Sequence, residues 1–166
     1  MSATISVPSS DRWLARLVSG RPHQLIGPPD RPYLLRWFVI PPNRWCNIYW
    51  QFRFVGSDDP VPHCHPWDFM SFMLRGSYIE ADEHGSRRRR HAGQVAFHRA
   101  EYRHRIILDP APAPIDIADE QACTTLVITG PRRRMWGFWC NGSRFVPWRE
   151  FGAGGCGETD QPQVRP

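Results

Sequence analysis

The chain has 166 residues, of which 41% are hydrophobic and 13% aromatic, so it can form one folded domain and is not a disordered polypeptide. Its net charge of +5 comes from 21 basic residues that are all arginine, which excludes Schiff-base and lysine-base chemistry. No apolar run reaches the roughly 20 residues of a membrane span, and the N-terminus lacks a signal-peptide pattern. We therefore expect a cytoplasmic protein without a membrane partner.

The N-terminal residues 1–32 are expected to hold a short helix and a proline-rich connector. Ser10 is a candidate N-cap, and the helix should end before Gly20. Four apolar residues would share one face of this helix: Trp13, Leu14, Leu17 and Val18.

From Tyr33 onward the chain is rich in aromatic and β-branched residues, with turn signals at spacings of roughly 8 to 12 residues, which is typical of all-β sandwiches and barrels. Residues 33–151 should form this barrel, with a loop at 110–120, and residues 152–166 are expected to be a disordered tail. Strands are predicted over 33–40, 46–54, 68–75, 77–83, 87–91, 94–98, 104–108, 123–129 and 135–140.

The five cysteines are scattered, odd in number and never arranged as a CxxC pair. This pattern favours reduced thiols over a disulfide framework. The cysteines are Cys46, Cys64, Cys123, Cys140 and Cys156.

Three histidines have spacings that suit a metal site. In HCHPWDFMSFMLRGSYIE, His63 and His65 stand one residue apart, so on an extended chain they project to the same side with Cβ atoms roughly 6 to 7 Å apart, while Cys64 points the other way. Both imidazoles could then reach one ion at about 2.0–2.2 Å. The best third ligand is His104, which ends the segment GQVAFHRAEYRH and opens the next strand.

These two segments resemble the two motifs of the cupin superfamily. GSDDPVPHCHPWDFMSFMLRGSY is similar to the first motif, a His-x-His pair followed by a glutamate and then a glycine, and GQVAFHRAEYRH is similar to the second. Together they span residues 56–106. More loosely, PYLLRWFVIPPNRWCNIYWQF and ITGPRRRMWGFWC resemble segments of uncharacterised small cupin-like proteins of bacteria and phages. The resemblance implies an all-β protein with a single cupin-type jelly-roll β-barrel, here preceded by the short helix.

The match to the family motifs is not complete. His63, His65 and His104 match the histidine ligands, and the motif glycines match Gly76 and Gly93. Phe69, however, stands where the family has its glutamate ligand, with Asp68 one residue out of register and Glu80 beyond the glycine. The usual proline and glycine of the second turn are replaced by Arg99 and Glu101.

Three interpretations of the site therefore stay open. The three histidines could bind a metal alone, or Asp68 could be a fourth ligand if a bulge at 66–67 turns it inward. Alternatively, the histidines could fill the barrel without a metal. Of the remaining histidines, His98 is expected to face away from the cavity; His84 and His91 belong to a polar hairpin and His23 to the connector.

The run RRRR at 87–90 raises the question of nucleic-acid binding. Acidic residues in EADE at 80–83 precede a turn, so the segment should fold into a hairpin in which acids pair with arginines. We therefore do not expect a nucleic-acid partner.

Polar residues that border the predicted ligands are candidates for acid–base catalysis. Tyr78 and Glu80 stand two residues apart and could share a face of one strand, and Tyr102 and Arg103 stand beside His104. The arginine-rich surroundings would suit a small anionic substrate.

The function favoured by these residues and by the resemblance is a metal-dependent enzyme acting on a small polar or anionic molecule. An Fe(II) centre held by three histidines leaves positions for substrate and O₂, as in non-haem iron oxygenases; Ni, Zn and Mn are alternative metals. The alternatives are an isomerase or epimerase of sugar-like substrates, and a small-ligand-binding cupin without catalytic activity. A homodimer is compatible with the sequence.

Overall fold

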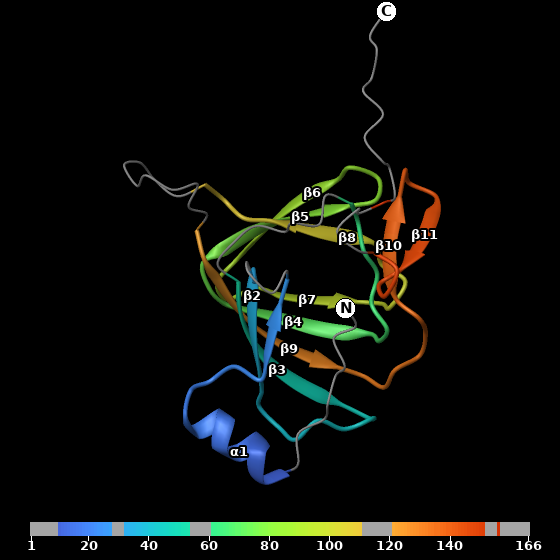
Figure 1. The fold of residues 1–166 in the computed structure, drawn as a ribbon. Helices are drawn as coiled ribbons and strands as arrows, with labels where there is room; N and C mark the ends of the chain where they lie inside the picture. The colour runs from blue at the N-terminus through green and yellow to red at the C-terminus, as the bar shows by residue number, and fades with distance from the viewer. Residues whose placement is uncertain (1–9, 28–31, 54–60, 111–120, 152–155, 157–166) are drawn as a thin grey trace, which may run out of the picture.

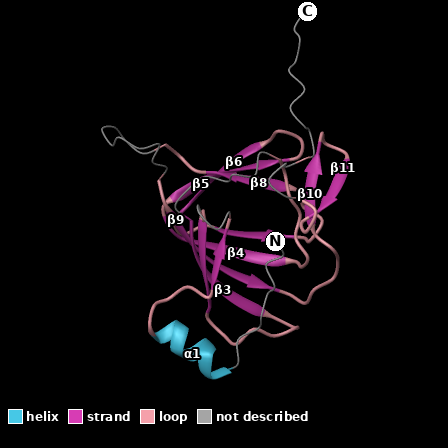
Figure 2. Ribbon diagram, viewed as in Figure 1, coloured by secondary structure: helices cyan, strands magenta, loops and turns pink. Residues whose placement is uncertain are grey.

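The computed structural model describes residues 10–27, 32–53, 61–110, 121–151 and 156 (Figure 1). It contains one short helix followed by β-strands (Figure 2). The elements are α1 (Ser10–Val18), β1 (Gln24–Ile26), β2 (Leu34–Phe38), β3 (Asn47–Arg53), β4 (Phe69–Arg75), β5 (Ser77–Asp82), β6 (Arg87–His91), β7 (Val95–His98), β8 (His104–Ile107), β9 (Cys123–Thr129), β10 (Gly137–Cys140) and β11 (Arg144–Pro147).

The strands form two antiparallel layers that face each other. A six-stranded sheet has the order β1-β2-β3-β9-β4-β7, and a three-stranded sheet has the order β6-β5-β8. The hairpin of β10 and β11 lies at one side, next to the ends of both layers (Figure 1). The all-β class predicted from the sequence is confirmed.

The predicted strands agree with the structure to within two residues at each end. Two strands were not predicted. One is β1, three residues long, which lies in the proline-rich connector and pairs with β2, so the segment 1–32 adds a strand to the large sheet. The other is β11, which ends at Pro147 and pairs with β10. Both strands are too short for an alternation of apolar and polar residues to be recognised in the sequence.

The chain passes from one layer to the other at Gly76, between β4 and β5. Its φ of +78° lies in the left-handed region, and a Cβ here would stand 2.6 Å from the carbonyl oxygen of Ala122. Only glycine fits both conditions without strain. This is the residue that matches the closing glycine of the first motif.

The space between the layers holds two clusters of buried apolar side chains. Trp67 and Trp13 of α1 pack against the second cluster, and the indole N–H of Trp13 donates to the carbonyl of Phe38 at 2.9 Å. The predicted apolar face of α1 is only partly used, because Leu14 and Val18 are 51% and 79% exposed. The clusters are Met73, Tyr78, Ile106, Leu108 and Cys123, and Phe38, Tyr49, Phe69 and Val127.

Cys140 and Cys156 form a disulfide, so the expectation that all five cysteines are reduced is wrong for this pair. Their separation of 16 residues is not a recognisable sequence motif. Cys46, Cys64 and Cys123 are free. Apart from Cys156 and Pro110, the predicted tail and the predicted loop at 110–120 lie outside the described residues.

The described residues contain no helix long and apolar enough to cross a membrane; α1 has nine residues.

Candidate metal centre

The predicted histidine pair lies in an extended segment that is fixed on both sides by backbone hydrogen bonds. His63 exchanges two of them with His104, at 2.9 and 3.0 Å, and the amide of Cys64 donates to the carbonyl of Gly137 at 3.0 Å. The amide of His65 donates to the carbonyl of Ala100, also at 3.0 Å. Cys64 is fully buried on the side opposite the two histidines, as its parity predicts.

The three predicted histidine ligands converge on one point. Their ring centroids form a nearly equilateral triangle, with separations of 5.0 Å between His63 and His65 and 5.1 Å from each of these to His104. One ring nitrogen from each lies within 4.8 Å of the others. The Nε2 atoms of His65 and His104 are 2.9 Å apart. Two nitrogens bound at right angles to one ion, each about 2.1 Å away, would be about 3.0 Å apart, so the spacing fits a shared divalent ion.

Glu80 fixes the orientation of the His104 ring from behind. Its Oε1 accepts a hydrogen bond from Nδ1 of His104 at 2.6 Å, and its Oε2 accepts from Nε and Nη2 of Arg90 at 3.0 and 2.8 Å. Because Nδ1 carries the proton, the lone pair of His104 lies on Nε2 and points toward His65. A carboxylate that orients a histidine ligand through its second nitrogen is a common support of metal sites.

The ionisation states suit metal binding. Burial, followed by the charges of neighbouring histidines, lowers the pKa of His63 and His65 well below 6.5. Both rings are therefore neutral at pH 7, which is the form that binds metals. Burial alone would raise the pKa of Glu80, but the hydrogen bond from His104, the charges of His104 and His98 and the hydrogen bond from Arg90 together lower it to about 2.

The prediction that His98 faces away from the cavity is wrong. On β7 the side chains of Val95 and Phe97 are exposed, which places His98 on the inner face, 6% exposed. Its Nε2 lies 3.1 Å from Oε1 of Glu80, close enough for an ion pair but without hydrogen-bond geometry. Burial, partly opposed by the charge of Glu80, lowers the pKa of His98 to about 4.

Glu80, His98 and His104 form a second group of donor atoms that could hold a metal ion. This group uses the opposite ring nitrogen of His104, whose proton already bonds to Glu80. A metal there would have to displace that proton, so the hydrogen-bonded arrangement is sufficient to explain the second group.

The structure does not bring Asp68 to the histidines. Its Oδ1 accepts a hydrogen bond from the amide of Ala100 at 2.8 Å, and its Oδ2 accepts from Arg133. Ala100 in turn accepts the amide of His65, so Asp68 braces the turn that holds this ligand. Phe69, in the position of the family glutamate, points inward, with its ring 4.5 Å from His65 and 4.9 Å from His98.

The two predicted tyrosines differ in their surroundings. Tyr78 is 6% exposed in an apolar cluster, where burial and the charge of Glu80 raise its pKa to about 12 despite a hydrogen bond with Ser71. Tyr102 is only partly buried, stacks on His98 at 4.8 Å and has its ring 5.2 Å from that of His104. Of these two tyrosines, it is therefore Tyr102 whose ring lies against a candidate metal ligand, His104.

Comparison with known proteins adds evidence on the fold. The chain matches no protein-family model and no curated protein sequence. It is similar in structure to the polyketide cyclase RemF from Streptomyces resistomycificus, with a TM-score of 0.53 and 15% identity over 72% of this chain and 76% of that one.

Two further structures are similar at lower scores. One is a protein with a double-stranded β-helix domain from Klebsiella pneumoniae, with a TM-score of 0.49 and 12% identity over 83% of this chain and 97% of the other. The second is an RmlC-like cupin from Ralstonia eutropha, with a TM-score of 0.48 and 17% identity over 74% and 71% of the two chains. The chain has the cupin fold. The fold resemblance predicted from the two histidine motifs is confirmed, and at these identities the likeness concerns the fold alone.

Proposed function

We propose that this chain is a metal-dependent enzyme, a non-haem Fe(II) oxygenase that acts on a small polar or anionic molecule. The observation that carries the proposal is the convergence of His63, His65 and His104, whose donor atoms lie within 4.8 Å of one another. Imidazole ligands suit Fe, Zn and Ni among other divalent metals, and three protein ligands leave further positions for substrate. When bound, Fe(II) would supply the redox chemistry with O₂.

Three neutral imidazoles do not compensate the charge of a divalent ion. An anionic substrate group would do so, which favours a small acid as the substrate over a neutral molecule. The protein side chains around the histidines support this arrangement: Trp67 stacks on His65 at 5.2 Å, and Glu80 holds His104.

Tyr102 is the most suitable proton donor among the residues predicted for catalysis. Both oxygens of Glu80 already accept hydrogen bonds, and its low pKa leaves it without a proton to give. Tyr78 is enclosed in the apolar cluster. We assign Glu80 to positioning, and Tyr102 to contact with the substrate.

Metal analysis and a gas probe test this proposal together. Protein purified anaerobically without chelators should hold about one divalent ion per chain, and Fe(II)-loaded protein should bind nitric oxide, a surrogate of O₂, and give a high-spin EPR signal. The His104→Ala variant should lose both properties. An ion that exchanges for Fe(II) but gives no nitric oxide signal would contradict an oxygenase, because no open position would then exist.

One observation favours a second function, non-redox acid–base catalysis. Tyr102 stacks on His98 with an interplanar angle of 11°, next to Glu80, which provides a set of proton-transfer groups beside the histidine triad. An isomerase, an epimerase or a cyclase could use it, and the structural neighbour RemF is a polyketide cyclase. Activity retained by zinc-substituted protein in the absence of O₂ would favour this alternative.

A further inference from the structure

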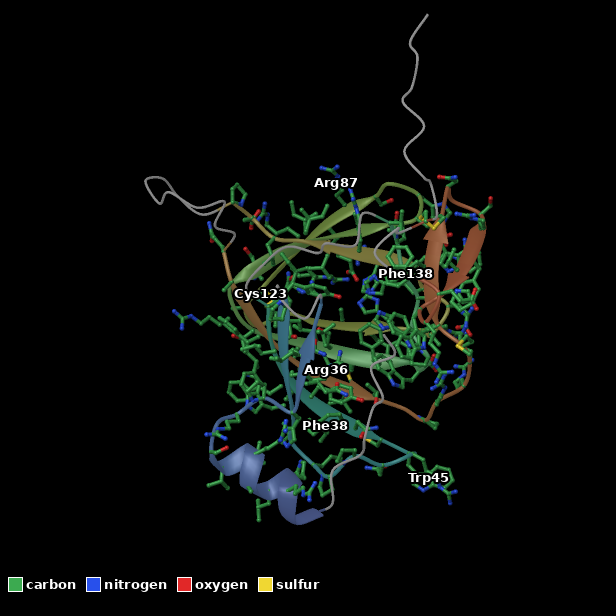
Figure 3. The ribbon with its side chains drawn as sticks, viewed as in Figure 1. Arg36, Phe38, Trp45, Arg87, Cys123 and Phe138 are labelled. Carbon is green, nitrogen blue, oxygen red and sulfur yellow. A yellow bond between two sulfur atoms is a disulfide. The ribbon has the colours of Figure 1, made fainter. Side chains whose placement is uncertain are left out.

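Two arginines point into the space between the sheets. On β2, Leu34 and Phe38 are buried inner residues, and Arg36 between them shares their face. Arg53 lies on the inner face of β3, two residues after Gln51, which pairs with Arg36 across the strands. Figure 3 shows Arg36 among the side chains that fill the space between the layers.

Among the described residues, the side chains that Arg36 contacts are neutral. Arg36 donates to Gln24 at 3.3 Å and, with the amide of Gln51 turned to present its oxygen, to Gln51 at 3.0 Å from Nε and from Nη2. Its guanidinium carbon lies 4.6 Å from the centre of the Tyr49 ring. Among the described residues, no aspartate or glutamate forms an ion pair with it.

Arg53 is less well satisfied. Its guanidinium lies over the ring of Tyr33 at 5.1 Å, and its Nη1 is buried without a hydrogen-bond partner in the part of the chain that the structure describes. Burial lowers the pKa of Arg36, and the charge of Arg53 lowers it further, so the two cations also repel each other. Buried charges are normally paired, because their desolvation is costly when no counter-charge is present.

A line of ring contacts connects Arg36 to the histidine triad. The Tyr49 ring under Arg36 is 6.2 Å from Trp67, and Trp67 stacks on His65. In agreement with this proximity, the positive charge of Arg36 contributes to the low pKa of His65, and that of Arg53 to the low pKa of His63.

We propose that Arg36 and Arg53 bind the carboxylate of the substrate, a small organic acid whose other end reaches the histidine triad. Guanidinium groups bind carboxylates through paired N–H donors, and the free Nη1 of Arg53 is such a donor. This inference rests on the proposed function for the position of the reacting end. The carboxylate site itself requires only the two arginines.

Titration of the metal-free protein with three probes tests the carboxylate site. Malonate should bind, whereas malonamide, its neutral analogue, should bind at least ~10-fold more weakly, because a charged hydrogen-bond partner contributes more than a neutral one. Arg53→Gln should weaken malonate binding by a similar factor, and Arg75→Gln, which removes an exposed arginine of β4, should leave it unchanged. Equal binding of malonate and malonamide would overturn the proposal. Tighter binding of inorganic phosphate than of malonate would overturn the assignment to a carboxylate.

Thermal unfolding separates this role from a structural one. In the ligand-free protein, Arg53→Met removes a partly buried charge that has no ion pair among the described residues, so it should keep or raise the unfolding midpoint while it abolishes malonate binding. A strongly lowered midpoint would indicate that Arg53 serves the fold, and would contradict the proposal.

Metal content distinguishes this inference from the proposed function. Both Arg36→Gln and Arg53→Gln should retain the metal. If wild-type protein binds malonate but no metal, the metal centre fails and the carboxylate site stands. If it binds the metal but does not distinguish malonate from malonamide, the carboxylate site alone fails.

A separate observation concerns the outer face of the six-stranded sheet. Three rows of paired residues cross this face, and apolar side chains occupy almost all of their positions. The first row is Phe97, Met70, Ile128 and Ile48; the second is Val95, Phe72, Leu126, Trp50 and Trp37; the third is Thr124, Phe52, Leu35 and Leu25.

Much of this surface, which we call the outer apolar face, is exposed. Phe97 is 64% exposed, Leu25 60%, Val95 51% and Trp50 48%. Among the described residues paired in the three rows, only Arg75 of β4 is charged, and it lies opposite Thr124 at the end of the third row. With roughly 150–250 Å² for a large side chain, the most exposed members alone leave on the order of 500 Å² of apolar surface open. That is already near the upper end of the largest apolar patch on a typical monomer.

We infer that a second copy of this chain covers the outer apolar face. Apart from Arg75 at the end of the third row, the described residues of this face offer no charge with which to select an acidic or basic partner, whereas an identical apolar face matches it. With its less exposed residues included, its area approaches the ~800 Å² per partner of a standard stable interface. A two-fold dimer would place the two sheets face to face, as in a β-sandwich.

The oligomeric state tests this inference. Wild-type protein should sediment as a dimer at micromolar concentration, and the double variant Trp50→Glu/Phe97→Glu should be a folded monomer. The control is Trp45→Glu, since Trp45 is 66% exposed but lies outside β3 and the outer apolar face. A monomeric wild type, a dimer that persists in the double variant, or a wild-type monomer that co-sediments with phosphatidylcholine vesicles would each overturn it.

Discussion

The two faces of the six-stranded sheet have reversed characters. An antiparallel sheet usually turns its apolar residues toward the core and its polar residues toward water. Here the outer face is apolar, and the inner face carries several polar and charged side chains beside its apolar ones. The inner polar residues include Gln24, Arg36, Gln51, Arg53, Ser71, His98, Thr125 and Thr129. This difference is the common basis of the carboxylate site that we propose between the layers and of the dimer contact that we propose on the outer face.

The inner face tolerates its polar residues because most of them satisfy one another. Arg36 donates to Gln24 and Gln51 on this face, and Glu80 of the facing three-stranded sheet accepts hydrogen bonds from His104 and Arg90. Two exceptions among the described residues are Arg53 and His98, whose Nη1 and Nε2 atoms are buried without a hydrogen-bond partner. Changes on the inner face should therefore affect binding first, and changes at the rim or outside should leave binding almost intact.

The largest effect is expected from the histidine triad itself. His63→Ala, His65→Ala and His104→Ala should each abolish retention of the metal, because each removes one of three protein ligands. His84→Ala should keep full occupancy, since His84 lies exposed in the turn between β5 and β6. Metal analysis after gel filtration measures the occupancy of the three histidine variants and of the control. Full occupancy in the His104→Ala variant would exclude the triad.

A smaller loss is expected from Glu80→Gln, which keeps the size of the side chain and removes its charge. His104 would lose the carboxylate that orients it, and loss of such a partner commonly weakens metal binding by about 10- to 100-fold. Competition with a chromogenic chelator measures the affinity. Glu83→Gln is the matched control, because Glu83 pairs with Arg103 on the outside of the small sheet. An affinity loss as complete as that of a histidine variant would show that Glu80 ligates the metal directly.

The supporting role of Glu80 could not be predicted from the sequence. The spacing of the histidines and the parity of an extended chain were enough to predict three ligands and the orientation of Cys64. The role of Glu80 depends on the pairing of β5 with β8, which sets Asp82 opposite His104 and puts Glu80 on the same face. That register joins segments about twenty residues apart, and the chain spacing does not encode it.

The misplacement of His98 has a different cause. Phe97 resembles a core residue, so its neighbour was predicted to face outward, yet Phe97 belongs to the outer apolar face. The rule that apolar residues mark the inner face of a strand does not hold for a sheet whose faces are reversed in this way. For the same reason the inward orientation of Arg36 and Arg53 could not be predicted, because in a strand of ordinary pattern these arginines would lie at the surface.

At the rim of the site, Asp68→Asn should affect stability more than metal binding. Asp68 holds the turn at Ala100, and the loss of its charged hydrogen bonds should cost roughly 1–3 kcal/mol. The hydrogen bond from Ala100, followed by that from Arg133, lowers the pKa of Asp68 below 3.8. Its contribution is therefore present above about pH 4 and is lost as the pH falls below 3.8. Urea unfolding should show wild type and variant converging in acid, with metal affinity changed less than 10-fold at pH 7. An affinity loss of 100-fold or more would instead identify Asp68 as a ligand.

The smallest effect is expected from the four arginines of β6. Four phosphate contacts would give a log–log salt slope near −3.6 for binding to duplex DNA, at about 0.9 per contact. Arg90 already pairs with Glu80, and Arg89 with Asp109, which leaves Arg87 and Arg88 without an ion pair among the described residues. At most two contacts remain, so the slope should be no steeper than about −1.8, and binding should vanish near physiological salt. Arg87→Gln/Arg88→Gln should remove this residual binding and leave metal content unchanged, because neither residue contacts the triad. Tight wild-type binding that persists at physiological salt with a slope near −3.6 would mean that DNA displaces both ion pairs, and β6 would then be a nucleic-acid-binding strand.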